Sequence, residues 1–527
     1  MPKIVIREID NTTAGGGTYA NFSVVVPGFV KAAVAATATT PAFQPNLNVF
    51  DDNGVYECTN REDFEKNIGL TNSVNNKVAD LKAPTRAEGW ETPKALTEDN
   101  FKELVKTGTL YTIVNNTTGS IGNRADEEYI YTYAEKDKSY AFKASEEDED
   151  SDDFTKFVVL SDEGHDEIFE EHYGNQIAYE LLGLGYTVLY KKMESTDYLA
   201  RKDFWTPLKD KTLYDFRYII SGLIRGNSAV HSNMVEIAEF TPEKADFDDI
   251  GVTTHGRGDC IALLDIDENV YSGKNQEEAI RSILSATDAL PKSKYAAVFA
   301  PTVKYAKGGL GSTEILESFG NNQWFPASFH YLACAARSSE RFAEWYANAG
   351  YTRGISKYTV EAVGCKFGEA AVNMFQKRVS DPDNDVVMAI NPIINLRGTY
   401  YLWGNRTAET LGAAGTDDGD LKASHFLNIR QLCCSIKKKV YVTCRQATFD
   451  PNSDLLWVKF CNSIKPLLDK MKADQGIADY KISKVKTKRK AFLSVIIRIV
   501  PIEAVEDFDI SIHLEDSLEG IIATAEE

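Results

Sequence analysis

The C-terminal stretch of this chain, from about residue 415 onward, constrains the fold more than any other part of the sequence. Residues 454–473 carry apolar side chains at the spacing of an amphipathic helix, and the runs 480–485 and 492–500 are rich in strand-forming residues. A further run, 508–514, alternates between apolar and polar residues, which is typical of a strand with one buried face. Helices followed by strands predict an α+β domain over residues 415–527.

The predicted helix 454–473 is edged by lysines. Its candidate N-caps are Asn452 and Ser453, and Pro466 inside it predicts a kink or the start of a new turn. The apolar stripe consists of Leu456, Phe460, Ile464, Leu467 and Met471. Helical geometry puts two lysines on each side of this stripe, Lys459 and Lys470 on one side and Lys465 and Lys472 on the other. An ordinary amphipathic helix with solvated lysines is the plain alternative to a binding surface.

Residues 481–490 reverse the charge of the chain locally. Six of these ten residues are basic, whereas the 527-residue chain has a formal net charge of −20. A nucleic-acid patch is one interpretation, but the run lacks interleaved aromatic residues. A docking face for an acidic protein surface explains it more economically. The acidic total disfavours nucleic acid and anionic membranes as partners of the whole chain.

Two predicted strands lie at the ends of the chain. The N-terminal arm, residues 3–9, contains Ile4, Ile6 and Ile9 and is joined to the rest by a glycine-rich joint at 12–17. The C-terminal arm, residues 508–514, places four apolar residues on one face, Phe508, Ile510, Ile512 and Leu514. Unpaired apolar edges invite pairing between chains, so both arms are candidates for strand donation. Pairing within their own chain is the open alternative.

The middle of the chain, residues 176–414, reads as an α/β domain. Residues 186–190, 259–266 and 295–303 are predicted buried strands, and 275–289 has helical spacing, so a strand–helix–strand unit is expected. Farther on, 426–440 is predicted as a helix and 441–446 as a strand. An apolar run at 22–26 ends at Pro27 and Gly28.

A polar, turn-rich block separates the N-terminal part from this domain. Within residues 31–175, the run 146–153 has seven acids in eight residues and predicts a solvated surface loop. The length of the chain predicts two to four domains. We therefore expect an arm and first strands at 1–30, a variable polar and acidic surface insertion at 31–175, the α/β domain at 176–414 and the α+β domain at 415–527.

Composition limits the compartment and the chemistry. No run reaches the ~20 apolar residues of a membrane span, and the first residues have no apolar core of a signal peptide, so folding in a cytoplasm is expected. The eight cysteines contain no Cys-x-x-Cys pair and lie mostly in apolar runs, which predicts reduced, buried thiols.

No motif predicts an active site. His165 and His172 are seven residues apart, which is not metal-ligand spacing on a helix, and the glycine-rich loop 308–313 lacks the lysine of a phosphate loop. The tripeptide at 257–259, Arg-Gly-Asp, is short enough to recur by chance. We therefore expect no enzyme activity, no catalytic residues, no cofactor and no metal. A soluble α/β enzyme with a surface insertion remains the alternative of a different class.

Five motifs in one order resemble the contractile tail sheath proteins of bacteriophages and contractile injection systems. They comprise an alanine-rich stretch at 324–337, Glu-Trp-Tyr at 344–346, Asn-Pro-Ile-Ile-Asn at 391–395 with Trp-Gly-Asn-Arg-Thr at 403–407, Phe-Asp-Pro-Asn at 449–452, and Pro-Ile-Glu at 501–503. The resemblance covers residues from about 320 to 515. Departures from the family pattern are the missing Pro-Gly-Val near the start and Arg430-Gln431 in place of paired arginines.

The resemblance implies a structural protein. Its subunits would form stacked hexameric rings around an inner tube and contract to drive the tube through a cell envelope. Terminal arms from neighbouring subunits would complete the C-terminal sheet, and the 454–473 helix would face the tube. The implied partners are further copies of the chain, the tail tube protein, and baseplate and tail terminator proteins, without nucleic acid or membrane insertion. The implied location is a virion tail assembled in the host cytoplasm; an extracellular contractile injection system is the alternative.

Overall fold

The computed structural model describes residues 23–31, 33, 43–70, 174–193, 197–222, 228–240, 256–310, 312–319, 322–376, 388–410, 422–485 and 493–502, and the backbone of three strands between 130 and 158. Both predicted arms, the glycine-rich joint at 12–17, the acidic run at 146–153, and His165 with His172 lie outside these residues.

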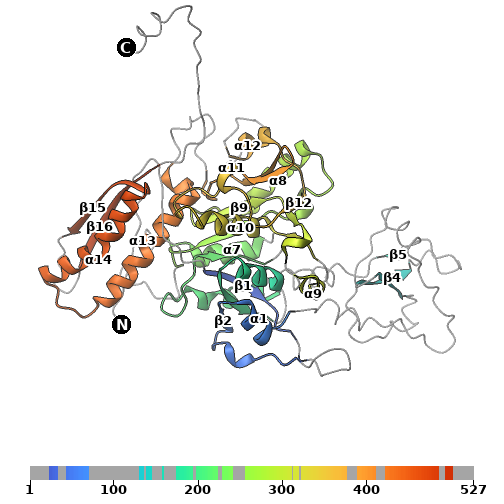
Figure 1. Ribbon diagram of the computed structural model, residues 1–527, viewed down its shortest axis with the longest axis horizontal. Coiled ribbons are helices and arrows are strands. Elements are labelled where there is room, and N and C mark those ends of the chain that lie inside the picture. Colours follow the sequence, from blue (N-terminus) through green and yellow to red (C-terminus); the bar gives the residue numbers. More distant parts are fainter. Residues whose placement is uncertain are drawn as a thin grey trace, which may run out of the picture.

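An eight-stranded sheet forms the centre of the α/β body (Figure 1). Its order is β14-β13-β9-β8-β7-β1-β6-β2, and the six strands from β13 to β6 are parallel. The antiparallel strands β2 and β14 lie at its two ends. The strands are β1 (Ser23–Gly28), β2 (Val55–Cys58), β6 (Thr187–Lys192), β7 (Tyr218–Ile219), β8 (Ile261–Asp265), β9 (Ala296–Ala300), β13 (Asn391–Leu396) and β14 (Thr399–Leu402).

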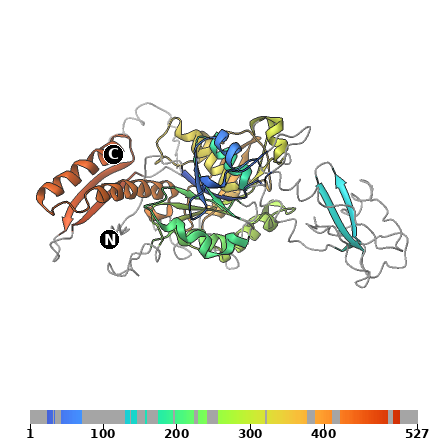
Figure 2. The ribbon, with the colours of Figure 1, turned by 90° about the horizontal axis from the view of Figure 1, so that it is seen from below.

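Helices cover both faces of this sheet, as Figure 2 shows. Ala262 and Leu264 of β8 face one layer of helices, and Ile261 and Leu263 face the other. The first layer contains α5 (Asp197–Ala200), α6 (Lys202–Trp205), α7 (Ser228–Ala238), α8 (Gln276–Ala286) and α12 (Glu369–Gln376). The second contains α1 (Arg61–Asn67), a helix at 174–183, α9 (Thr313–Ser318) and α10 (Ala327–Ser339). Burial on both faces explains the nearly unbroken apolar runs of the central strands β8 and β9.

Several predictions for this body are confirmed. β6, β8 and β9 lie within or beside the predicted strands, and α8 lies within the predicted helix 275–289. β8 pairs in parallel with β9, as the strand–helix–strand prediction requires. Residues 23–26 of the apolar run belong to a central strand, β1, between β6 and β7.

Residues 43–70, which the sequence analysis includes in the surface insertion, instead complete the α/β body. β2 pairs with β6, and Cys58, Phe64 and Ile68 are buried in the core. Arg61 of α1 forms an ion pair of 2.5 Å with the buried Glu180. These few apolar residues lie among polar ones, so their burial depends on contacts with distant parts of the chain.

Smaller sheets and short helices complete the structure. The three-stranded sheet β11-β10-β12 comprises β11 (Trp324–Phe325), β10 (Val303–Tyr305) and β12 (Val360–Val363). A separate sheet comprises β3 (Ile130–Glu135), β4 (Lys138–Ala144) and β5 (Phe157–Val158). The remaining short helices are α11 (Gly350–Arg353) and 3-10 turns at Leu47–Val49, Thr206–Lys209, Glu268–Val270, Thr287–Ala289, Lys307–Gly309 and Ala423–His425.

The C-terminal unit, residues 427–502, extends from one side of the body (Figure 1). It consists of α13 (Leu427–Gln446), α14 (Asp454–Ala473), β15 (Ile477–Val485) and β16 (Ser494–Pro501). The helix 454–473 and both following strands are confirmed. The predicted strand at 441–446 is wrong, because α13 continues to Gln446 and packs its Val440 and Cys444 with the core of the unit.

Candidate functional site

The hairpin β15–β16 and the helix α14 form the candidate site. The hairpin covers α14 with one face, through Tyr480, Ile482, Val495, Ile497 and Ile499. Its other face carries Ile496 and Val500, which are 38% and 55% exposed. Within the described residues the hairpin is a sheet of two strands, so each strand has one edge without a partner strand. Open strand edges accept further strands.

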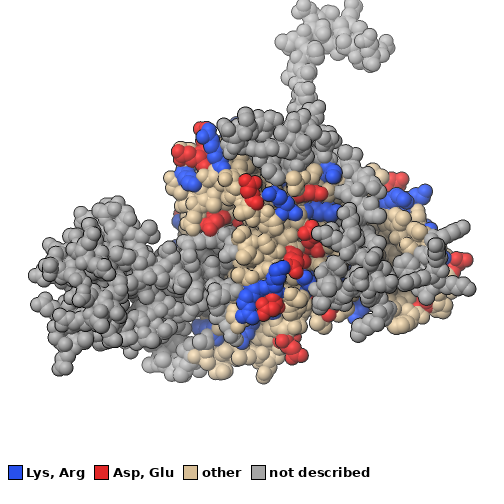
Figure 3. Space-filling model, turned by 180° about the vertical axis from the view of Figure 1, so that it is seen from behind, with Lys and Arg blue, Asp and Glu red and all other residues tan. Residues whose placement is uncertain are grey.

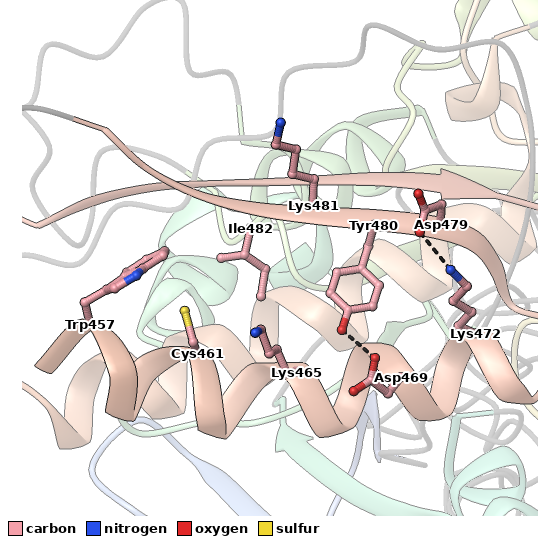
Figure 4. Close-up of a pocket in the computed structure, with 9 residues that line it drawn as sticks. All are labelled: Trp457, Cys461, Lys465, Asp469, Lys472, Asp479, Tyr480, Lys481 and Ile482. Atoms are coloured by element: carbon pink, nitrogen blue, oxygen red, sulfur yellow. Dashed lines mark hydrogen bonds and ion pairs between the residues drawn. The ribbon is translucent and has the colours of Figure 1, made fainter. Parts of the chain in front are cut away.

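A groove of about 570 Å³ follows the open edge of β15 (Figure 4). The residues that line it come from one flank of α14 and from four consecutive positions of β15. They are Trp457, Cys461, Lys465, Asp469 and Lys472 of α14, and Asp479, Tyr480, Lys481 and Ile482 of β15. Because consecutive strand residues point to opposite faces, four in a row show that the groove borders the edge of the strand.

Some of the charged side chains in the groove have a partner of opposite charge and others do not. Lys472 forms an ion pair of 2.8 Å with Asp479, and the Tyr480 hydroxyl donates to Asp469 at 2.5 Å (Figure 4). Burial and the Asp469 carboxylate together raise the pKa of Tyr480 to about 12. Lys465 and Lys481 have no acidic partner among the described residues. The groove therefore carries excess positive charge.

The structure separates the four predicted tube-facing lysines into two pairs. Lys465 and Lys472 line the groove beside β15. Lys459 and Lys470 are exposed on the other flank of α14, where Lys459 lies 3.6 Å from Asp450. This division into two flanks agrees with the prediction from helical spacing. The role of these lysines in binding a tube stays a prediction.

The start and course of α14 follow from its sequence. The Ser453 hydroxyl accepts the Leu456 N–H at 3.4 Å, which confirms one of the two predicted caps. The predicted stripe is largely buried, and Leu468 adds to it. The helix is continuous through Pro466.

The turn between α13 and α14 contains an unusual residue of the Phe-Asp-Pro-Asn motif. Phe449 has a φ of 74°, a left-handed backbone conformation that is uncommon for a bulky residue, and its side chain is 88% exposed. The ring is thus not held by the core of the chain.

A buried polar network joins α13 to the body. Arg217 forms an ion pair with Glu344 and donates to the Ser435 hydroxyl. Lys437 donates to the Gly258 carbonyl and the Tyr295 hydroxyl, both at 2.9 Å. Sequence reasoning missed this network, because Arg217, Glu344 and Ser435 lie far apart along the chain and only the fold brings them together.

Two of the sequence motifs, the Arg-Gly-Asp tripeptide and the glycine-rich loop 308–313, have structural roles. Arg257 and Asp259 of the Arg-Gly-Asp tripeptide form a buried ion pair of 2.9 Å. In the glycine-rich loop, Ser312 caps α9 through the Ile315 N–H. The described residues contain no group of His, Cys, Asp and Glu that could hold a metal. None of the eight cysteines, all of which the structure describes, forms a disulfide, and six are buried, as predicted.

No helix in the described part of the chain has the length and apolar character to span a membrane. On the face drawn in Figure 3, basic and acidic residues are interspersed.

Comparisons with known proteins find likeness in structure. No family model matches this chain, and no curated protein matches it in sequence. A chain of the anti-feeding prophage baseplate is 13% identical over 65% of this chain and 80% of its own, with a TM-score of 0.43. A chain of the contracted sheath complex of an extracellular contractile injection system is 18% identical. The match covers 64% of this chain and 78% of that one, with a TM-score of 0.43. The sheath tail protein of Listeria innocua is 8% identical. The match covers 94% of this chain and 97% of that one, with a TM-score of 0.38.

These structures include sheath proteins, the family that the sequence motifs resemble. At such identities and TM-scores the likeness carries no argument about function. That argument is drawn from the motifs and from the geometry of the C-terminal unit.

Proposed function

We propose that this chain is a structural subunit of a contractile tail sheath. The observation that carries the proposal is the incomplete sheet of the C-terminal unit, in which β15 and β16 each leave an edge without a partner among the described residues. This sheet lies directly beside the lysine-edged helix α14, in the span where the sequence has its family motifs. An incomplete sheet with long open edges suits a protein that assembles by exchanging strands.

In this proposal the two arms complete the sheet in neighbouring subunits. Ile4, Ile6 and Ile9 of the N-terminal arm, and Phe508, Ile510, Ile512 and Leu514 of the C-terminal arm, supply the apolar faces. Two more strands would convert the hairpin into a four-stranded sheet with a helix on one face. Flexible arms would keep rings joined while their bodies slide past one another during contraction.

The inner tube is the second partner. α14 would face it, with Lys459 and Lys470 as leading charges and Lys465 and Lys472 as secondary ones. Exposed ion pairs contribute only about 0–1 kcal/mol each and are screened by salt. Many weak pairs would hold a tube, and each ring would still release it in turn. Baseplate and tail terminator proteins would close the two ends of the sheath.

The setting would be a bacteriophage tail, assembled in the host cytoplasm and carried on the virion. The sheath of an extracellular contractile injection system is the second candidate, because the sequence motifs fit both. A soluble α/β enzyme is the candidate from another class.

Negative-stain electron microscopy of the purified full-length chain tests the proposal. We expect long hollow cylinders at high protein concentration. Deletion of residues 1–12 should give soluble, folded subunits that form no cylinders. Discrete particles from the full-length chain, or normal cylinders from the deletion variant, would contradict the proposal.

A further inference from the structure

The turn that leads into β2 contains Asn53 followed by Gly54, the one Asn-Gly pair in the sequence. In such a pair the backbone nitrogen of the glycine can attack the side-chain amide carbon of the asparagine, because glycine has no β carbon to shield that nitrogen. Gly54 has a φ of 70°, and a β carbon placed on it would meet nothing closer than 3.9 Å beyond its chain neighbours, so this side of the turn is open. Asn53 is half-buried, and solvent therefore reaches part of it.

Hydrogen bonds of the folded turn occupy both of the groups that would react. The Gly54 N–H donates to the Asp51 carbonyl at 2.9 Å, which fixes the attacking nitrogen. The Asn53 side-chain amide donates to the Tyr214 hydroxyl, also at 2.9 Å, which fixes the leaving group. Ring closure requires the backbone N–H to lose its proton and the amide to turn toward it, so both bonds oppose the reaction. The folded turn therefore protects Asn53.

Tyr214 connects this turn to a distant part of the α/β body. It lies 161 residues from Asn53 along the chain, and it is 6% exposed and packs in the core of the body. Its hydroxyl donates to the Asp51 carboxylate. Burial and this carboxylate raise the pKa of Tyr214 to about 12, so the phenol keeps its proton at neutral pH and can bond to both residues. The Asn53 amide is thus held while residues 43–70 are docked on the body.

We infer that Asn53 is a site of spontaneous modification, at which hydrolysis of the side-chain amide gives aspartate and isoaspartate, and that Tyr214 controls the rate. Solvent base takes the Gly54 N–H proton, the nitrogen bonds to the Asn53 Cγ, and the amide nitrogen leaves as ammonia. Water then opens the succinimide ring, at the Cγ carbonyl to give aspartate or at the backbone carbonyl to give isoaspartate. The net reaction consumes water and releases ammonia, and nothing is oxidised or reduced. The inference does not depend on the proposed function.

Either product changes the turn irreversibly. The new carboxylate replaces the amide that donates to Tyr214, and it competes for that hydroxyl with the Asp51 carboxylate. The Lys191 ammonium donates to the backbone carbonyl of residue 53 and offsets part of the new charge, but it does not restore the lost donor. Isoaspartate also lengthens the backbone just before Val55, which pairs with Lys191 in the register of β2 with β6. The modification therefore opposes the docking of β2 at the end of the central sheet (Figure 1).

Peptide mapping by mass spectrometry tests the inference, because chromatography separates the asparagine, aspartate and isoaspartate forms of the peptide that contains residue 53. Purified full-length protein is incubated at mildly alkaline pH, either folded or unfolded in guanidinium chloride. We expect slow conversion in the folded wild type and fast conversion in the unfolded chain. Folded Tyr214→Phe should convert about fivefold faster than the folded wild type, the ratio that corresponds to the loss of one ordinary hydrogen bond.

Tyr179→Phe is the matched control. The Tyr179 hydroxyl donates to Glu65 at 2.9 Å, so it binds the same segment 43–70 at another residue, and its loss should leave the rate at Asn53 unchanged. Equal rates for Tyr179→Phe and Tyr214→Phe would overturn the control by Tyr214. Equal rates for folded and unfolded wild type would overturn the protection by the turn, and this comparison decides the question even if Tyr214→Phe does not fold. No conversion in the unfolded chain would show that residue 53 is not a modification site.

The effect of the product on the turn has its own test. Asn53→Asp imitates the product with a normal backbone, whereas Asn53→Ser removes the amide without adding a charge. We expect Asn53→Asp to unfold at a lower urea concentration than Asn53→Ser, because its carboxylate competes with that of Asp51 for the Tyr214 hydroxyl. Equal midpoints for the two variants would contradict the predicted loosening of the turn.

Discussion

At the scale of single residues, the buried charges between α13 and the body hold the C-terminal unit in place. The Arg217 and Glu344 side chains are only 2% and 9% exposed, and Ser435 of α13 bonds to both. Removing one member of a buried ion pair leaves the other charge without compensation, which costs more than the pair itself contributes. The attachment of the unit therefore depends on a few side chains.

Arg217→Ala should destabilise the protein strongly. The variant leaves the Glu344 carboxylate buried without its cation, and we expect a loss of about 3–5 kcal/mol in the free energy of unfolding. Urea denaturation measures this. Arg201→Ala is the matched control, because Arg201 and Asp203 form a pair whose side chains are 52% and 68% exposed, and solvent screens such a pair. Equal losses from the two variants would show that Arg217 contributes no more than a surface arginine.

Asp265 should give the stability a pH dependence. It is buried at the end of β8 and accepts the Ser328 N–H at 2.7 Å and the Ser328 hydroxyl at 2.5 Å. Burial raises the pKa of Asp265 from 3.8 to about 7, although these hydrogen bonds oppose the rise. The folded protein thus holds this proton more tightly than the unfolded chain. The resulting stabilisation is complete below about pH 4 and is lost as pH rises through about 7.

Asp265→Asn removes this titration. From pH 4 to pH 7, the free energy of unfolding of the wild type should fall relative to that of the variant, by up to ~4 kcal/mol. Urea denaturation of both proteins at several pH values measures the difference. Parallel curves across this range would show that Asp265 has an ordinary pKa in the folded protein.

At the scale of elements, the sequence predicts helices and strands best where the apolar pattern is long and the contacts that decide it lie within the element. α14 agrees with its prediction at both ends, since its cap and its apolar spacing both lie within the element. Residues 441–446 read as a strand because they include Tyr441, Val442 and Thr443. They are helical because Cys444 packs in the core of the C-terminal unit, a contact made between elements.

The same reason explains which parts of the candidate site could be predicted. The lysines on each flank of α14 follow from helical geometry alone. The groove does not, because it exists only where β15 crosses α14 and leaves its edge open. The same holds for the pairing of β2 with β6 and for the ion pair between Arg217 and Glu344. Both form between residues that lie far apart in the chain.

Reversing the charge on one flank of α14 tests its predicted contact with the tube. Lys459→Glu with Lys470→Glu should yield empty or spontaneously contracted sheaths, because both acids would lie where cations are expected to hold the tube. Both lysines are exposed, so circular dichroism should show a folded monomer. The same exchange at Lys465 and Lys472 should have a weaker effect on tube retention. Extended, filled tails from the first double variant would show that this flank faces another direction.

At the scale of the whole molecule, the C-terminal unit and the small sheet β3–β5 lie on opposite sides of the α/β body (Figures 1 and 2). If α14 faces an inner tube, the opposite side of the body faces away from it. Variable, polar segments are tolerated where no partner packs against them. The arrangement therefore favours the β3–β5 region as the outer surface of the assembly.

Deletion of residues 146–153 tests this orientation. The run has seven acids in eight residues and lies in sequence between β4 and β5, so we expect it on the outer surface, away from the tube and from the arms. Its removal would leave the open edges of β15 and β16 and the lysines of α14 unchanged. The variant should therefore form cylinders of normal length in negative stain, and a shortened loop of glycine and serine serves as the control for chain continuity. Loss of cylinders in both variants would mean that the acidic run contributes to an interface between subunits, because its charge would then be needed where two copies meet.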